Sequence, residues 1–204
     1  MLKLWGRLNS LNVQKVVLAL EESGTPYQRT DAGLQFGHNK TPEYLAKNPM
    51  GLVPVLEDDD FVLWESNAIT RYLCAKYAPA FYYSDLRERA DAERWMDWQA
   101  TLNGALVPAF YNLVRAEPSK RDMSAVETSL QKTAELFVMF DAHLKDRDFV
   151  AGQHFGFGDF GLAPIAHRWL HMPCERASIP NVEAWYQRLM QRPAFQRVLT
   201  LPLS

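Results

Sequence analysis

Ser10 is the residue in the first part of the chain most able to do chemistry. It lies in Asn9-Ser-Leu-Asn12, between an expected strand at 2–5 and an expected helix directly after it. A helix N-terminus presents unpaired N–H groups and the positive end of the helix dipole, so a hydroxyl there can help to hold an anion. The alternative is that Ser10 or Asn12 only caps the helix, and the residue types alone favour that interpretation.

A second group of candidate residues lies between a hairpin and a helix. Two apolar runs at 53–56 and 61–64 flank an acidic turn and predict a β-hairpin, and a helix is expected to follow from Glu65 and Ser66. Pro54 cannot donate to a strand ladder, so it predicts an edge, a turn or a cis bond. A free strand edge beside a helix N-terminus suits a ligand that is peptide-like and anionic.

These segments resemble the glutathione-binding half of the cytosolic glutathione S-transferases. The pattern N-P-x-G-x-V-P-V-L begins at Asn48, and E-S-x-A-I-x-x-Y-L begins at Glu65. Residues 5–16 resemble the first strand, active-site loop and first helix of bacterial serine-type (theta- or nu-like) members. The segments 94–98, 155–159 and 180–185 resemble landmarks of their helical domain. A lone V-P-V would carry little weight, whereas this match is collinear over nearly the whole chain.

The resemblance implies a role for each candidate residue. Ser10 would donate a hydrogen bond to the glutathione sulfur and stabilise the thiolate, lowering the thiol pKa from about 8.5 toward neutrality. Asn12 would be the second donor. The Glu65 side chain would take the γ-glutamyl ammonium, and the Ser66 hydroxyl with nearby backbone amides would take its carboxylate. For Glu65 the alternative is simple stabilisation of the helix dipole.

The resemblance also implies that the backbone at Val53 and Pro54 meets the cysteinyl part of glutathione as an added strand, with a cis peptide before Pro54. Leu52 departs from the family, because many relatives have a lysine there that reaches the glycyl carboxylate. Asn39 and Lys40 are the candidates to replace it, and the alternative for each is an exposed polar loop.

Aromatic residues of the second half could line a hydrophobic acceptor site. They are Phe110, Tyr111, His167 and Trp169, and core packing would explain each aromatic equally well. His167 and His171 lie one helical turn apart, but two ligands are weak evidence for a metal, and no metal is expected. A helix surface or a pocket wall accounts better for both histidines.

Size, composition and charge narrow the class of protein. The chain has 204 residues with a net charge of −2, which gives no electrostatic case for binding nucleic acid. No stretch approaches the roughly 20 apolar residues of a membrane span, and the N-terminus shows no signal-peptide pattern. Cys74 and Cys174 lie far apart without metal-like spacing, so a cytoplasmic protein with reduced thiols is expected.

The expected organisation is an α/β thioredoxin-like N-terminal domain at 1–80 and an all-α helical domain at 86–204. The first has a βαβ–α–ββα pattern, and the second holds a long apolar stripe that Pro108 should interrupt. Further helices are expected at 125–144, 159–171 and 182–192. Asp159 closes a capping box that would begin at Gly156, which indicates a folding residue.

The function that follows is conjugation of glutathione to small hydrophobic electrophiles. The thiolate held by Ser10 would attack an electrophilic carbon held beside the helical domain. One alternative is a glutathione-dependent disulfide reductase or peroxidase, and another is a non-catalytic carrier or interaction protein, against which Ser10, Glu65 and Ser66 count. Aromatic residues at 81–83 and in the helix carrying Trp95 indicate a homodimer.

Overall fold

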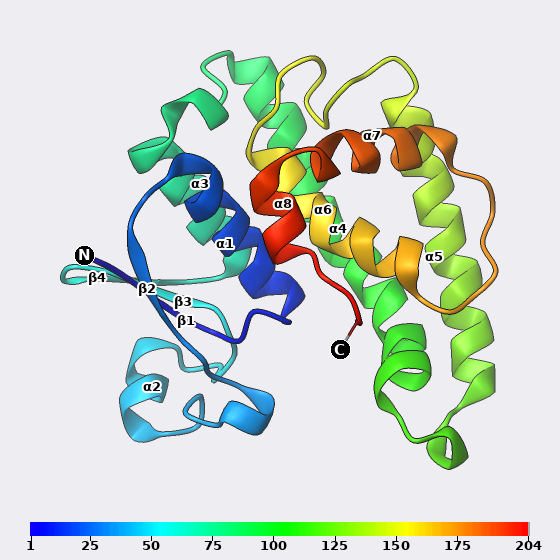
Figure 1. Ribbon diagram of the computed structural model, residues 1–204, viewed down its shortest axis with the longest axis horizontal. Helices are drawn as coiled ribbons and strands as arrows, with labels where there is room; N and C mark the ends of the chain where they lie inside the picture. Colours follow the sequence, from blue (N-terminus) through cyan, green and yellow to red (C-terminus); the bar gives the residue numbers. More distant parts are fainter. Residues whose placement is uncertain (204) are drawn as a thin grey trace. The chain divides into compact units, whose positions relative to one another are not determined.

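A computed structural model describes residues 1–203 as two compact units, Met1–Tyr83 and a helical unit that begins at Ser84. The first unit contains the strands β1 (Leu2–Trp5), β2 (Tyr27–Thr30), β3 (Val55–Asp58) and β4 (Phe61–Trp64). Its helices are α1 (Leu11–Ser23), α2 (Pro42–Lys47) and α3 (Ser66–Tyr77). Figure 1 traces this order along the chain. Short 3₁₀ turns occur at Leu34–Phe36 and Pro79–Phe81.

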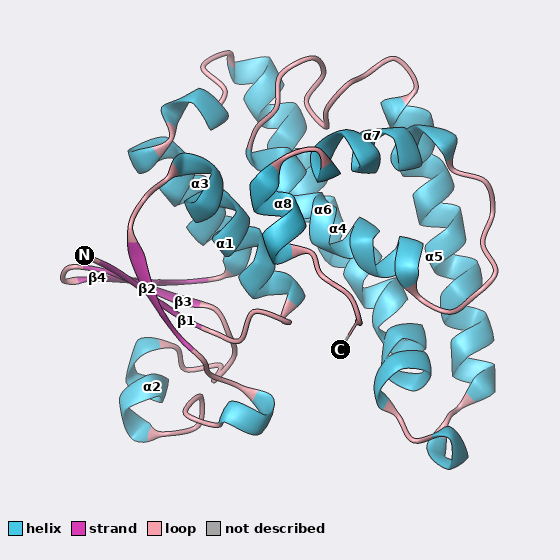
Figure 2. Cartoon of the chain, viewed as in Figure 1, coloured by secondary structure: helices cyan, strands magenta, loops and turns pink. Residues whose placement is uncertain are grey.

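The four strands form one sheet in the order β2-β1-β3-β4. The β1–β2 pair is parallel, and the β1–β3 and β3–β4 pairs are antiparallel. Helices α1 and α3 lie together on one side of the sheet, and α2 lies on the other (Figure 2). The thioredoxin-like arrangement that the sequence predicted is confirmed, and it brings the start of α1 and the start of α3 to the same side of the sheet.

Local sequence explains where the helices of this unit begin and end. Helix α1 ends at Gly24, whose φ of 65° is left-handed and whose N–H bonds back to the carbonyls of Leu20 and Glu21. Helix α2 begins with Thr41, whose hydroxyl accepts from the N–H of Tyr44, and Pro42 occupies the first helical position. Both ends follow from residue types that favour the end and the start of a helix.

A buried carboxylate fixes α3 to the end of β3. Asp58 accepts hydrogen bonds from the hydroxyls of Tyr72 and Tyr77 at 2.6 and 2.7 Å and from Lys76 Nζ at 2.7 Å. Burial acts to raise the pKa of Asp58, but the three donors outweigh it and bring the pKa down to about 2. The hairpin turn therefore anchors the C-terminal half of α3.

The helical unit contains α4 (Leu86–Phe110), α5 (Met123–Leu144), α6 (Phe157–His171), α7 (Pro180–Met190) and α8 (Pro193–Val198). Helix α6 is its centre, because its residues from Phe157 to Trp169 are all buried. None of the helices described in residues 1–203 has the length and hydropathy needed to cross a membrane.

Two prolines lie close to changes of helix geometry in this unit. Helix α4 runs through Pro108 to Phe110, and its geometry changes only afterwards, in a π-helical turn at Tyr111–Arg115. The helix expected at 182–192 ends at Met190, and Pro193 starts a separate helix, α8. Proline is compatible with the first turn of a helix, so Pro193 marks a new start that the apolar spacing did not reveal.

Asp159 is a folding residue, as the sequence predicted. Its carboxylate accepts from the N–H groups of Gly156 and Val150, both at 3.0 Å, and from Trp185 Nε1 at 2.8 Å. Complete burial raises the pKa of Asp159 to about 6, against the effect of these donors. The carboxylate thereby joins α6, α7 and the loop at 145–156.

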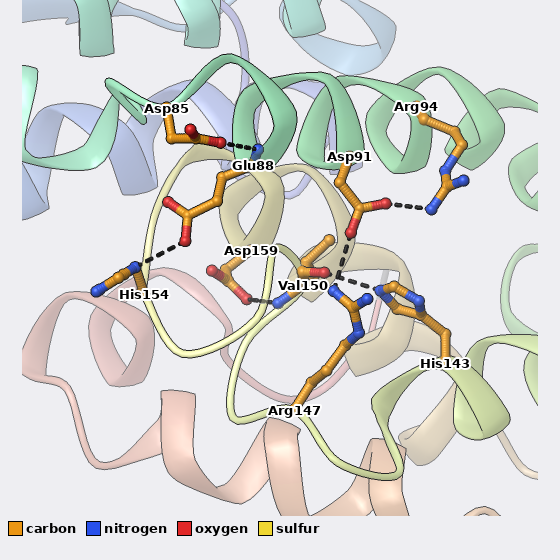
Figure 3. Close-up of polar contacts among 9 residues, drawn as sticks. All are labelled: Asp85, Glu88, Asp91, Arg94, His143, Arg147, Val150, His154 and Asp159. Carbon is orange, nitrogen blue, oxygen red and sulfur yellow. Dashed lines mark hydrogen bonds and ion pairs between the residues drawn. The ribbon is translucent and has the colours of Figure 1, made fainter.

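Exposed and half-buried ion pairs hold the same loop to α4 (Figure 3). Arg147 pairs with Asp91 at 2.9 Å, and His154 pairs with Glu88 at 3.1 Å. The backbone carbonyl of Val150, close to Asp159, contacts the ring of His143 at 2.8 Å. These contacts serve the structure of the helical unit.

The aromatic residues behind the dimer expectation are largely internal. Trp95 is only 8% exposed and Tyr83 only 6%, while Trp98 is half-buried. Trp95 packs against Trp98 and Phe140 with ring centroids 4.8 and 5.3 Å apart. Core packing therefore accounts for most of this aromatic surface.

The two cysteines are both free in the described part of the chain. Cys74 lies buried in α3, and burial raises the pKa of its thiol to about 12. Cys174 is half-buried in the segment between α6 and α7. Among residues 1–203, no three His, Cys, Asp or Glu side chains are grouped to hold a metal ion.

Candidate functional site

Ser10 occupies the N-cap position of α1, but its hydroxyl has no capping role. Its backbone is extended, with φ −84° and ψ 124°, and its carbonyl accepts from the N–H of Gln14 at 2.9 Å. Within residues 1–203, its side chain makes no capping hydrogen bond. The hydroxyl of Ser10 therefore lies at the positive end of a helix without capping it. The alternative, that the Ser10 side chain serves only as a helix cap, does not apply.

The loop before Ser10 is tied to the chain that follows β2. The N–H of Gly6 bonds to Thr30 O at 2.8 Å, and the N–H of Arg7 bonds to Ala32 O at 3.2 Å. The Arg7 guanidinium lies against Gly33, where an added Cβ would come within 2.8 Å of Nη1. Sequence reasoning missed this cation. The sequence feature that could have indicated it is a single arginine three residues before Ser10.

Ser66 is the first residue of α3 and is joined to Asn12. Ser66 is 6% exposed, and its hydroxyl donates to Asn12 Oδ1 at 3.2 Å. Asn12 itself is exposed near the start of α1. The structure thus brings together two residues that lie 54 positions apart in the chain, one predicted for the thiol end and one for the γ-glutamyl end.

Glu65, the N-cap of α3, has a strained backbone. Its φ is 71° and its ψ is 109°, a region that residues with a Cβ rarely adopt. Its carbonyl accepts from the N–H of Ile69 at 2.9 Å, and its side chain is exposed. Strain of this kind, about 1–3 kcal/mol, persists at sites where the geometry serves a function.

Lys15 is a second residue that sequence reasoning missed. It is only 2% exposed, and its Nζ lies 3.0 Å from Asn67 Oδ1 and 3.4 Å from Ser66 Oγ. Burial lowers the pKa of Lys15 to about 7, Glu65 opposes this shift, and Arg71 adds to it. The signal that the sequence offers is a charged residue, preceded by Gln14, in the otherwise apolar run of α1 from Val13 to Leu20.

Hydrogen bonds from two buried side chains hold the backbone of the segment before β3. Tyr44 and Asn48, both buried, donate to the carbonyl of Leu52 at 2.7 and 2.9 Å. The peptide between Val53 and Pro54 is cis, as the resemblance implied. No backbone group within the described chain pairs with the N–H or C=O of Val53, so these two groups can pair with an extended ligand.

The two candidates for the place of the missing lysine differ in what they do. The side chain of Leu52 is 59% exposed and apolar. Asn39 Nδ2 donates to the carbonyl of Gly51 at 2.7 Å, so it supports the loop. Lys40 is exposed, and its Nζ lies so close to Gly51 that an added Cβ there would come within 2.7 Å of it. The structure places the Lys40 ammonium beside Gly51, the residue before Leu52.

The four residues predicted for the acceptor site lie in different surroundings. Phe110 and Trp169 are buried, and Trp169 stacks on Phe137 with ring centroids 5.3 Å apart. Tyr111 is 57% exposed at the start of the π-helical turn. Phe110 packs under the guanidinium of Arg168, whose central carbon lies 4.3 Å from the ring centroid. Core packing therefore explains Trp169, and Tyr111 is the accessible member of the set.

The interpretation of His167 as a surface or pocket-wall residue is wrong. His167 is 2% exposed, its Nδ1 accepts from the hydroxyl of Tyr186 at 2.6 Å, and its Nε2 donates to Thr200 O at 3.2 Å. Burial, with smaller effects of His171 and Arg168, lowers the pKa of His167 to about 4. It is a neutral core residue, whereas His171 is exposed as predicted.

Comparison with known proteins identifies the family. Residues 1–75 match the glutathione S-transferase N-terminal domain, and residues 96–193 match the C-terminal domain. The chain is 43% identical to glutathione S-transferase GstB of Escherichia coli K12 over all of both chains. It is 34% identical to the probable glutathione S-transferase GSTF2 of Oryza sativa, over 98% of this chain and 96% of that protein.

A solved structure agrees with the sequence relatives. The theta class glutathione S-transferase of Xanthomonas axonopodis pv. citri, with glutathione bound, superposes with a TM-score of 0.97 and 43% identity. The match covers 100% of this chain and 99% of that one. Together with the uncapped Ser10 hydroxyl and the Glu65–Ser66 start of α3, these matches show that the chain belongs to the glutathione S-transferase family.

Proposed function

We propose that this protein conjugates glutathione to small hydrophobic electrophiles and that Ser10 holds the glutathione sulfur as thiolate. The observation that carries the proposal is the Ser10 hydroxyl at the start of α1, which makes no capping bond within residues 1–203. A hydrogen bond to a thiolate favours the charged form, and the positive end of the helix dipole does the same. The thiol proton leaves to solvent.

The conjugation step is simple in outline. The thiolate attacks an electrophilic carbon, a C–S bond forms, and the bond to the leaving group breaks with its electron pair. In an addition reaction, the electron pair moves within the acceptor and is later protonated by water. Thiolate stabilisation and proximity supply most of the rate gain.

The γ-glutamyl end of glutathione is proposed to bind at the start of α3. Its ammonium meets the Glu65 carboxylate, and its carboxylate meets the Ser66 hydroxyl and the N–H groups of the first turn. The strained backbone of Glu65 supports this placement, because strain is retained where a side chain must point in one direction.

The cysteinyl and glycyl parts are proposed to follow the segment before β3. The open backbone groups of Val53 would pair with the cysteinyl residue, and Pro54 would shape the turn. The glycyl carboxylate would meet Lys40, which replaces the lysine absent at Leu52. Asn39 has a supporting role, because its amide already holds the Gly51 carbonyl.

The acceptor is proposed to be selected by side chains of the helical unit. Tyr111 is the exposed candidate, and Phe110 is the buried aromatic residue next to it in the chain. The protein is also proposed to act in the cytoplasm as a homodimer.

A panel of three substrates tests the proposed reaction. Purified protein is given glutathione with an aryl halide, a hydroperoxide or a glutathione mixed disulfide. Turnover of the aryl halide that is lost in Ser10→Ala supports conjugation. Turnover of the mixed disulfide or the hydroperoxide alone would move the function to reduction, and activity with none of them would favour a carrier. Ser23→Ala, at the other end of α1, is the control for a simple effect on that helix.

A further inference from the structure

We propose that Lys15 is a positioning residue of the glutathione site that takes up a proton when the γ-glutamyl carboxylate binds at Ser66. The inference rests on the proposed function in one respect, the placement of that carboxylate at the start of α3. Lys15 itself would not touch the reacting sulfur. It would act through Ser66 and Asn67.

The geometry makes Lys15 part of a short hydrogen-bonded chain. Lys15 Nζ donates to Ser66 Oγ at 3.4 Å and to Asn67 Oδ1 at 3.0 Å, and Ser66 Oγ donates to Asn12 Oδ1 at 3.2 Å. If the Ser66 hydroxyl turned from Asn12 to an incoming carboxylate, its oxygen would still accept from Lys15. Lys15 therefore holds the Ser66 oxygen in place while the hydroxyl proton of Ser66 turns from Asn12 to the carboxylate.

The charge state of Lys15 is finely balanced in the protein alone. Removal of an ammonium from water is costly, and Lys15 is only 2% exposed between α1 and α3. Two charged groups of the α3 segment act on it in opposite directions: Glu65 favours the ammonium and Arg71 disfavours it. The resulting pKa of about 7 means that ammonium and neutral amine coexist near neutral pH.

A bound carboxylate would shift that balance. It places a negative charge at Ser66, whose oxygen lies 3.4 Å from Lys15 Nζ. A negative charge within about 4–6 Å favours the ammonium and raises its pKa. By linkage, binding above pH 7 takes up a proton, and affinity for the carboxylate falls as pH rises through the pKa of Lys15 in the free protein.

The test must separate this proton from the one that the glutathione thiol releases. S-Methylglutathione is the probe, because it keeps the γ-glutamyl group and has no ionisable thiol. Its binding is measured by calorimetry at pH 7.5 in buffers of different ionisation enthalpy, which gives the number of protons exchanged. Lys15→Arg keeps a permanent charge at this site, and Lys15→Met keeps the apolar stem without charge.

The wild-type protein is expected to take up a fraction of a proton more than either variant. Its affinity should fall about threefold or more between pH 6.5 and pH 8.5 relative to Lys15→Arg, as expected for a group with a pKa near 7. Equal proton exchange in the wild type and in whichever variant folds would overturn the inference. The exposed Lys3→Met is the control for a general change in charge, and it should behave like the wild type.

Ser66→Ala tests the proposed placement of the carboxylate separately from the proposed role of Lys15. If it leaves the affinity for S-methylglutathione unchanged, the carboxylate does not bind at Ser66 and the proposed placement is wrong. If Ser66→Ala weakens binding while proton exchange is the same with and without Lys15, the placement stands and only the role of Lys15 is overturned.

Discussion

The hydroxyl of Ser66 donates a hydrogen bond of 3.2 Å to Oδ1 of Asn12, and this contact joins the start of α3 to the start of α1. One end of the pair lies two residues after Ser10, and the other lies directly after Glu65. The residues proposed to act on the sulfur and on the γ-glutamyl group are therefore positioned by one another. A change at either helix start is expected to affect both ends of glutathione.

Ser10→Ala should lower turnover while glutathione affinity changes little. A hydrogen bond to a charged group contributes about 1.5–3 kcal/mol, so turnover at neutral pH should fall about ten- to hundredfold. The ultraviolet absorbance of the bound thiolate should then rise at a higher pH than in the wild type.

Asn12→Ala is the companion measurement for Ser10. Because the Ser66 hydroxyl would have to leave Asn12 Oδ1 to reach the γ-glutamyl carboxylate, removal of this competing acceptor should lower the Kd for glutathione slightly, with little shift in the thiol pKa. Wild-type turnover in Ser10→Ala together with a shifted thiol pKa in Asn12→Ala would transfer the role of sulfur donor to Asn12.

Two replacements of Glu65 should separate its contribution to glutathione binding from the strain of its backbone. Glu65→Ala and Glu65→Gly both remove the partner of the γ-glutamyl ammonium, so KM for glutathione should rise about ten- to hundredfold with kcat nearly unchanged. Only glycine also relaxes the backbone, whose φ is 71°. Denaturant unfolding should therefore show Glu65→Gly to be more stable than Glu65→Ala, by about 1 kcal/mol. A fall in kcat with unchanged KM would contradict the binding role.

Lys40→Ala should weaken binding through the glycyl carboxylate alone. An exposed ion pair contributes up to about 1 kcal/mol, so the Kd for glutathione should rise about fivefold or less. γ-Glutamylcysteine, which lacks the glycyl residue, should bind the wild type and Lys40→Ala equally. If Asn39→Ala, rather than Lys40→Ala, weakens the binding of glutathione without weakening that of γ-glutamylcysteine, then Asn39 and not Lys40 binds the glycyl carboxylate.

Asp58→Asn should destabilise the first unit, because it removes a carboxylate that three donors hold. The pKa of Asp58 is depressed to about 2, so its stabilising effect is complete above the pKa of the unfolded chain, about 4, and is lost as pH falls toward 2. Acid unfolding should show about 2 kcal/mol of pH-dependent stability between pH 4 and pH 2 that Asp58→Asn lacks. Asp60→Asn, in the exposed part of the same turn, should behave like the wild type.

Dimerisation is predicted through the first unit of one subunit and the long helices of the other. Val138 and Met139 of α5 are 49% and 45% exposed, and Met139 borders a hollow of about 510 Å³ lined also by Trp95 and Trp98. Light scattering should give about twice the 23.4 kDa chain mass. A monomer at all concentrations would rule the dimer out.

The sequence predicted those parts of the site whose positions follow from the succession of neighbouring strands and helices along the chain. Ser10 and Glu65 each lie between a strand and a helix, and such junctions are visible in a pattern of apolar residues. The same pattern of neighbouring residues predicted the hairpin, which the structure confirms.

Other features depend on contacts between distant segments. The burial of Lys15 follows from the packing of α1 on α3, and neither helix alone indicates it. His167 is neutral because Tyr186 and Thr200 reach it from elsewhere in the helical unit. Around Pro108, the Ser129 hydroxyl of α5 accepts from the N–H of Ala109 and donates to the carbonyl of Ala105, so a distant residue supports the helix through the proline.

An enzyme that attracts electrophiles also exposes its own sulfur atoms to them. Cys74 lies in the same helix as Ser66, and its buried thiol has a pKa of about 12. At neutral pH this thiol therefore stays protonated, and the thiolate is the form that reacts with electrophiles. Burial of Cys74 thus gives the glutathione-binding unit resistance to alkylation by the compounds that it is proposed to process, without the loss of an apolar side chain from its core.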